Sequence, residues 1–231
     1  MNILSRVRVP GRIAAVVVGL TLAHVSFAAA DLRIVTTEGS SVEGDASALP
    51  DAMRKAFGQN DPKQVTLWIG DDRSARVGED VTMIVRLDRK EMYTLDNGDQ
   101  TYRVIPLGAG RSSGPGQAPW RIVKSAETRQ VGEWTAVRHD LTIDIGGAPM
   151  DVTLWVSDVG VDTKTMRPFI EAFASSQGMD WMKAYNELDG YPVRQEVRMG
   201  PVMSWQEVVS ITQEPAPPGT YDAPAGYRKR H

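Results

Sequence analysis

"VRHDLTIDIGGAPMDVTLWV", residues 137–156, contains two runs of alternating apolar and polar residues on either side of a glycine pair. Successive side chains of a β-strand point to opposite faces, so this alternation is typical of a strand with one buried face. The Gly146-Gly147 pair provides the backbone freedom that a tight turn needs. The stretch therefore predicts two neighbouring antiparallel strands.

The same alternation recurs along most of the chain. Besides the two runs above, strands are predicted at 32–37, 65–69, 74–77, 81–87, 91–95, 101–105, 120–131, 193–199 and 204–213. Within this series, Asn97-Gly98 is expected to supply the positive φ values of a tight hairpin turn. Strands adjacent in sequence are therefore expected to pair in space, as an antiparallel meander of about ten strands.

One stretch, "TMRPFIEAFASSQGMDWMKAYNELDGYP" at 165–192, follows a helical period instead. Its apolar residues recur at spacings of three and four: Met166, Phe169, Ile170 and Phe173, then Trp181, Met182 and Tyr185 after a break at Gln177-Gly178. This spacing predicts one amphipathic helix, or two short helices in series, over 164–188. Gly190 and Pro192 are expected to end it.

A single helical unit cannot cover a flat sheet of ten strands, whose edges must also be protected. The predicted fold is therefore mainly β with a helical insert. It is a strongly curved antiparallel sheet or half-open β-barrel, and the helix at 164–188 lies across it as a lid.

The N-terminus has the pattern of a secretory signal peptide. Arg6, Arg8 and Arg12 precede an apolar run at 13–27, and small residues at 28–30 form an A-x-A cleavage site. We expect cleavage between Ala30 and Asp31, and export to the periplasm. The apolar run is too short for a membrane span, and the chain has no Cys to carry a lipid, so we expect a mature protein with no transmembrane or lipid anchor.

The mature composition argues against several classes of function. Loss of the signal leaves 23 basic residues against 29 acidic ones, a formal charge of −6, which disfavours binding to nucleic acid. Apart from the last residue, His139 is the one histidine left in the mature chain. The Asp and Glu residues of the chain do not have the spacing of a metal-binding loop. We therefore expect a protein that is not an enzyme and that has no catalytic residue, no metal-binding residue and no cofactor. A hydrolase that uses His139 is the alternative.

Large apolar side chains are the features that stand out as candidate site residues. We expect a hydrophobic ligand to contact Trp68, Met83, Trp155, Met166, Phe169, Phe173, Trp181 and Met182. Met and aromatic side chains adapt well to acyl chains. The alternative is that the same residues fill a solid core.

Three segments resemble a family of exported bacterial proteins: "IVRLDRKEMYTLDNGDQTYRVI" (84–105), "LDGYPVRQEV" (188–197) and "YDAPAGYRK" (221–229). That family is similar in architecture to the LolA/LolB lipoprotein carriers, in which helices cover the cavity of a half-open β-barrel. The resemblance implies one LolA-like domain over 31–231 that binds lipid or a lipoprotein acyl chain.

Two functions follow as hypotheses. The first is a soluble periplasmic binding or carrier protein, which holds a lipid or acyl chain between the curved sheet and the helical lid. The second is a cell-envelope adaptor or structural protein, which binds a protein partner and no small molecule.

Overall fold

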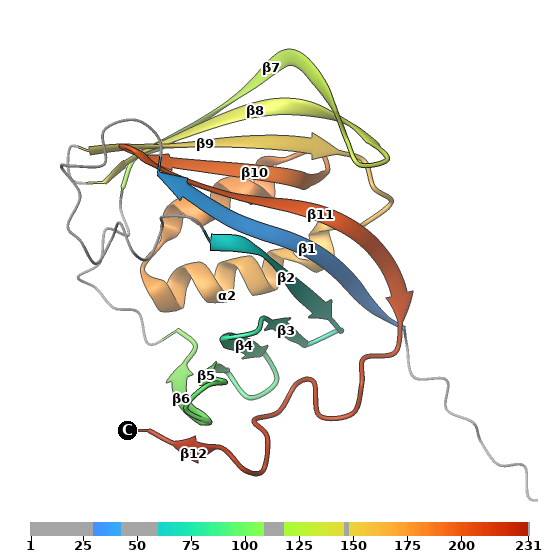
Figure 1. Cartoon of the computed structure of the whole chain (residues 1–231), viewed down its shortest axis with the longest axis vertical. Coiled ribbons are helices and arrows are strands. Elements are labelled where there is room, and N and C mark those ends of the chain that lie inside the picture. The colour runs from blue at the N-terminus through green and yellow to red at the C-terminus, as the bar shows by residue number, and fades with distance from the viewer. Residues whose placement is uncertain (1–29, 43–59, 109–117, 146–147, 231) are drawn as a thin grey trace, which may run out of the picture.

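The computed structural model describes residues 30–42, 60–108, 118–145 and 148–230 (Figure 1). Most of the expected signal peptide lies outside the described residues. So does the stretch at 51–57, whose sequence suggests a short helix, and most of the Gly-, Ser- and Pro-rich stretch at 107–120, whose composition predicts a loop. Within the described part of the chain, no helix is long and apolar enough to cross a membrane.

The described residues form a mainly β structure with one helical insert. The strands are β1 (Asp31–Val42), β2 (Asn60–Ile69), β3 (Arg73–Val77), β4 (Val81–Arg86), β5 (Glu91–Asp96), β6 (Thr101–Pro106), β7 (Trp120–Val131), β8 (Trp134–Ile145), β9 (Ala148–Ser157), β10 (Tyr191–Met199), β11 (Val202–Glu214) and β12 (Arg228–Lys229). Between β9 and β10 come η2 (Thr163–Thr165), α2 (Arg167–Gln177) and η3 (Asp180–Glu187), which we call the helical unit.

All twelve strands belong to one sheet, in the order β12-β6-β5-β4-β3-β2-β1-β11-β10-β9-β8-β7. Pairing is antiparallel except between β12 and β6. The sheet is thus two meanders, β1–β6 and β7–β11, joined where β1 pairs with β11. The register breaks where β11 pairs with β1, where β10 pairs with β9 and where β7 pairs with β8. Irregularities of this kind, such as β-bulges, bend strands and increase their twist.

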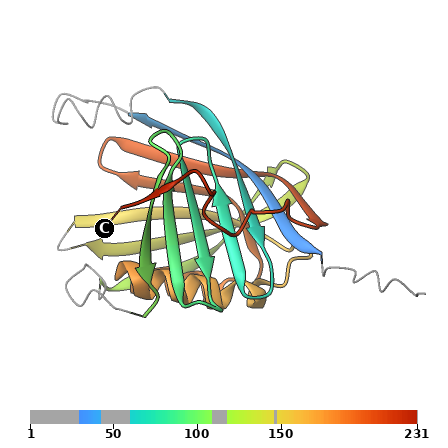
Figure 2. The ribbon, with the colours of Figure 1, turned by 90° about the horizontal axis from the view of Figure 1, so that it is seen from below.

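The curvature divides the sheet into two arms. Strands β2–β6 form the first arm and β7–β11 the second, and α2 lies between the arms (Figures 1 and 2). The sheet does not close, because β7 and β12 are the two ends of the strand order. We call the face toward the helical unit the inner face.

Each of the eleven runs predicted to be strands overlaps a strand, and β12 is the additional one. The meander is confirmed within each half but not between β6 and β7, which lie at opposite ends of the pairing order. The hairpin from β5 to β6 is also present, but Asn97-Gly98 does not supply its positive φ. Gln100 does, at φ 51°, while the Asn97 side chain donates hydrogen bonds to the Gly78 and Glu79 carbonyls.

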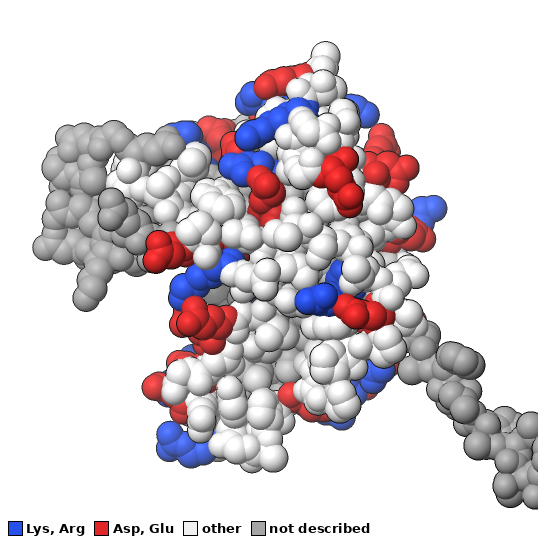
Figure 3. Space-filling model, turned by 45° about the vertical axis from the view of Figure 1, so that its right-hand side comes forward, with Lys and Arg blue, Asp and Glu red and all other residues white. Residues whose placement is uncertain are grey.

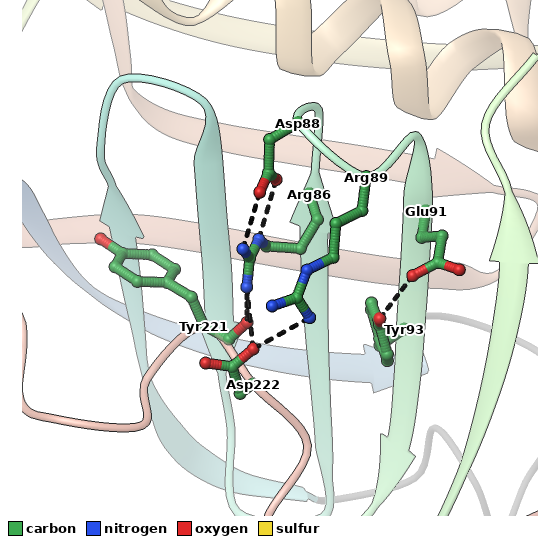
Figure 4. A network of polar contacts seen from close by, with 7 residues as sticks. All are labelled: Arg86, Asp88, Arg89, Glu91, Tyr93, Tyr221 and Asp222. Atoms are coloured by element: carbon green, nitrogen blue, oxygen red, sulfur yellow. Dashed lines mark hydrogen bonds and ion pairs between the residues drawn. The ribbon is translucent and has the colours of Figure 1, made fainter.

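A segment at 215–230, which we call the closing segment, covers the outer face of the first arm. Its Ala216, Tyr221 and Tyr227 pack with the outward-facing residues Trp68, Ala75, Ile84 and Leu95. Arg86, buried at the end of β4, fixes this segment: its guanidinium donates to the Tyr221 carbonyl at 3.1 Å and pairs with Asp222 at 2.8 Å (Figure 4). Asp88 completes the arrangement by pairing with Arg86 at 2.7 Å.

The ion pair between Arg86 and Asp88 predicts that the stability of the fold falls in acid. Hydrogen bonds from Arg86 lower the pKa of Asp88 from 3.8 to about 2. A carboxyl whose folded pKa is depressed contributes stability above its unfolded pKa, and that contribution is lost as the pH falls from about 4 to 2. In the Asp88→Asn variant, the free energy of unfolding measured with urea should decrease less over this pH range than in the unmodified protein. The control Asp61→Asn, at an exposed position of β2, should show the same decrease as the unmodified protein. Equal slopes for Asp88→Asn and the unmodified protein would contradict this.

Candidate ligand-binding site

The helical unit is built by local signals in the sequence. Pro168 lies in the first turn of α2, where its missing N–H costs no hydrogen bond. Gly178 ends α2 in the left-handed conformation, at φ 64°, and the Met179 N–H bonds to the Ala174 carbonyl at 2.8 Å. The chain then continues as η3. The predicted break at Gln177-Gly178 is therefore present, and the insert is two helices in series.

Apolar side chains of α2 pack against the inner face of the sheet. The inner cluster, as we call it, includes the buried residues Ile34, Ile69, Val85, Met92, Trp155 and Phe169 and the half-buried residues Leu32, Leu67, Met83, Met166 and Phe173. It combines residues of β1, β2, β4, β5, β9 and α2 with Met166, which precedes α2. Because methionine side chains of the sheet meet Met166 and the phenylalanines of α2 here, this apolar region is adaptable.

Trp181, Tyr185, Ala184 and Leu188 pack instead against a second cluster on the second arm. It contains Leu141, Ile143, Met150, Val152, Leu154 and Val156 of β8 and β9. The Tyr185 hydroxyl donates to Gln195 Oε1 at 2.7 Å, and burial raises the pKa of Tyr185 above its usual value. His139 lies buried on β8, with Nδ1 3.2 Å from the Val137 carbonyl oxygen.

The structure therefore brings together some of the eight predicted ligand-contact residues and separates others. Met83, Met166, Phe169 and Phe173 meet in the inner cluster. Trp181 lies with the second cluster, and Met182 is half-buried on η3.

Trp68 points to the outer face. It packs beneath the closing segment, with the Arg33 guanidinium 5.6 Å from its ring centroid. Trp155 is buried in the same cluster as Phe169, although its register partners on β8 and β10 are Arg138 and Arg194. The Trp68 indole is therefore placed to stabilise the sheet from outside, away from α2.

A pocket of about 950 Å³, which we call the mouth pocket, opens beside the inner cluster. It shares Leu32 and Ile69 with that cluster, and Thr165 and Pro168 of the helical unit form part of its wall. Its other walls come from the start of β1, the β2–β3 turn, the segment before η2 and the closing segment. None of the eight predicted residues lines it. No local sequence pattern marked this pocket, because its walls come from four separate segments.

Carboxylates dominate the charged groups of the mouth pocket. They are Asp31, Asp71, Asp72, Asp162 and Asp222, and Arg73 is the one cation among the lining residues. Elsewhere the charges are mixed, since on the face drawn in Figure 3 acidic and basic side chains are interspersed. Among the described residues no three His, Asp or Glu side chains are grouped so that they could hold a metal ion.

Structurally, then, the protein is a curved, open, mainly antiparallel sheet that holds a helical unit between its arms and has a pocket beside that unit. Residues 71–227 match the family described as "Domain of unknown function (DUF4412)". Because the match covers more than half of the chain, the protein belongs to this family.

Comparison with solved structures finds distant likenesses. The structure of PNGF-II in space group C2 has a TM-score of 0.42 and 10% sequence identity, over 87% of this chain and 30% of that one. The structure of PNGF-II in space group P21 has a TM-score of 0.43 and 9% identity, over 87% and 31%. This chain therefore spans about a third of those chains. A comparison with curated proteins gives no match.

Proposed function

We propose that this protein is a non-catalytic periplasmic binding or carrier protein for a lipid or acyl chain, held between the inner face of the sheet and α2. The observation that carries the proposal is the continuity between the inner cluster and the mouth pocket through Leu32 and Ile69. An acyl chain that passes through the pocket would reach the inner cluster at Leu32 and Ile69.

The way the helical unit is attached supports movement of α2 as a lid. Within the described residues, its side-chain hydrogen bonds to the sheet are few: Tyr185 to Gln195 at 2.7 Å, and a weak Gln177 contact to Met92 Sδ at 4.0 Å. Apolar packing therefore supplies most of the attachment. Apolar contacts have no directional requirement, so an acyl chain can replace those of α2 as it is buried.

The free energy of such binding comes from the ligand's own apolar surface. Each CH₂ group removed from water contributes about 0.8 kcal/mol, less the cost of displacing α2 and ordering the ligand. Met83 lies on the sheet side of the inner cluster and Met166 at the start of α2, so both would contact a ligand between the layers.

Ligand binding is tested in two ways. Native mass spectrometry of protein purified from the periplasm is expected to reveal a bound lipid, and a fluorescent acyl probe with an uncharged headgroup is expected to bind. The double variant Met83→Ala with Met166→Ala should weaken probe binding about tenfold, since it removes several apolar groups from the site.

The matched control is Met199→Ala with Met203→Ala. Met199 is half exposed, and Met203 faces outward opposite Arg198, so neither contacts the inner cluster. This control should bind the probe as the unmodified protein does. If the purified protein carries no lipid and does not bind the probe, the proposal is contradicted.

The adaptor hypothesis has one observation in its favour. In the described residues, β7 pairs with β8 along one edge and with no strand along the other, so it could accept a strand from a partner protein. Native mass spectrometry of the purified protein distinguishes the adaptor hypothesis from lipid binding. A stoichiometric protein partner without lipid would favour the adaptor.

A further inference from the structure

Carboxylates outnumber cations among the residues that line the mouth pocket. Asp222 pairs with Arg86 and Arg89 (Figure 4). Asp31 accepts a hydrogen bond from the Ala216 N–H at 2.9 Å. Asp162 accepts one from the Lys164 N–H. Asp71 and Asp72, in the β2–β3 turn, are exposed.

Arg73 offsets one of these charges, with its guanidinium stacked on the Tyr221 ring 4.9 Å from the centroid, but carboxylates still outnumber it among the lining residues. Carboxylates in a concave site raise the local concentration of cations. The pocket is therefore electrostatically suited to a positively charged group.

Tyr221 is a second observation at this site. It lines the mouth pocket with only 7% of its surface exposed, and no hydrogen bond of its hydroxyl meets the usual geometric limits. A buried polar group without a well-formed hydrogen bond costs free energy, so such groups often mark ligand sites. Burial raises the pKa of this hydroxyl, and so do the negative charge of Asp31 and the contact of the hydroxyl with that carboxylate.

Gly70 allows these groups to converge. A Cβ atom there would lie 2.6 Å from Asp31 Oδ1 and 3.4 Å from the Arg73 side chain. Absence of a side chain lets the Asp31 carboxylate and the Arg73 side chain both lie close to the β2–β3 turn. The site beside Tyr221 is thus shaped by the backbone as well as by its side chains.

We infer that the mouth pocket binds a primary ammonium group, and that the ligand is a cationic amphiphile whose apolar chain extends into the inner cluster. The ammonium would donate one hydrogen bond to Tyr221 Oη and others to the Asp31 carboxylate. Asp71 and Asp72 would add attraction from the rim. The amphiphile part of this inference rests on the proposed function, whereas the ammonium site does not.

Isothermal titration calorimetry tests the ammonium site and the binding of the apolar chain separately. The four probes, each used below its aggregation concentration, are dodecylamine, dodecanol, dodecanoate and propylamine. The protein is used as isolated after export, so that an α-ammonium of Asp31 created by the expected cleavage is already in place. Dodecylamine should bind at least about tenfold more tightly than dodecanol, and dodecanoate most weakly.

Two variants locate the effect. Asp71→Asn with Asp72→Asn should weaken dodecylamine about threefold to tenfold and leave dodecanol unchanged. Asp61→Asn with Glu133→Gln removes the same charge at two exposed positions outside the pocket and should change neither probe. Tyr221→Phe should weaken dodecylamine selectively without lowering the melting temperature, because it deletes an unsatisfied hydroxyl.

The outcomes are distinguishable. Tight binding of dodecanol with no gain for dodecylamine overturns the ammonium site and leaves the proposed function standing. Binding of propylamine without dodecanol supports the ammonium site and overturns the amphiphile. Equal losses in the two double variants overturn the assignment to the mouth pocket.

Discussion

Linking α2 covalently to β5 will abolish uptake of an acyl ligand. Gln177 of α2 and Met92 of β5 are in contact, with Nε2 4.0 Å from Sδ. The chain has no Cys, so cysteines introduced at these two positions would be its only thiols. A short thiol-reactive linker between them would hold the lid in place. If uptake requires displacement of α2, the linked protein should take up the probe at least about a hundredfold more slowly.

The linker itself must be shown not to cause the loss. The single variant Gln177→Cys, carrying the linker at one end, should bind the probe normally. Cleavage of a reducible linker should restore binding to the doubly substituted protein. Uptake at an unchanged rate while the link is intact would show that α2 is not the lid.

Gly190→Ala will destabilise the fold by about 3 kcal/mol or more. Gly190 joins the helical unit to β10 at φ 146°, a conformation that L-residues rarely adopt. A Cβ there would lie 2.6 Å from the carbonyl oxygen of Ser157, the last residue of β9. Because that oxygen belongs to the backbone, relief requires β9 and β10 to separate where the helical unit leaves the sheet.

Gly200→Ala is the matched control. Gly200 also has a positive φ, 56°, but no atom lies within 4 Å of the position its Cβ would take. It should lose only about 1 kcal/mol, the cost of the left-handed backbone for a residue other than glycine. Urea unfolding measures both variants. Similar losses in the two would mean that the contact at Ser157 is absent or easily relieved.

Strands and helices were predictable from the sequence because their signals are local. Alternation located the strands, and the spacing from Met166 to Tyr185, interrupted at Gly178, located two helices. β12 was missed because a two-residue strand carries no period, and its parallel pairing to β6 depends on how the closing segment returns to the sheet. The prediction that Asn97-Gly98 supplies the positive φ of the hairpin turn was wrong, since Gln100 does so. The Asn97 side chain instead donates hydrogen bonds to the neighbouring segment at 78–79.

The candidate site was less predictable, because alternation separates the two faces of a strand without saying which one faces the helix. Trp68 was therefore grouped with Met83 and Phe169, although it points outward. The closing segment covers Trp68, and the Arg129 guanidinium lies 5.5 Å from the Trp155 ring centroid. The mouth pocket depends on the meeting of residues as distant in sequence as Asp31 and Tyr221, which no local pattern reveals.

The central claim is that an acyl chain binds between α2 and the inner face of the sheet. The most direct measurement is the set of intermolecular nuclear Overhauser effects between a bound dodecyl chain and methionine methyl groups. The account predicts contacts from the chain to Met83, Met92 and Met166, and none to the half-exposed Met199 at the end of β10 or to the outward-facing Met203. A bound chain that contacts Met199 or Met203 and none of the inner three would contradict it.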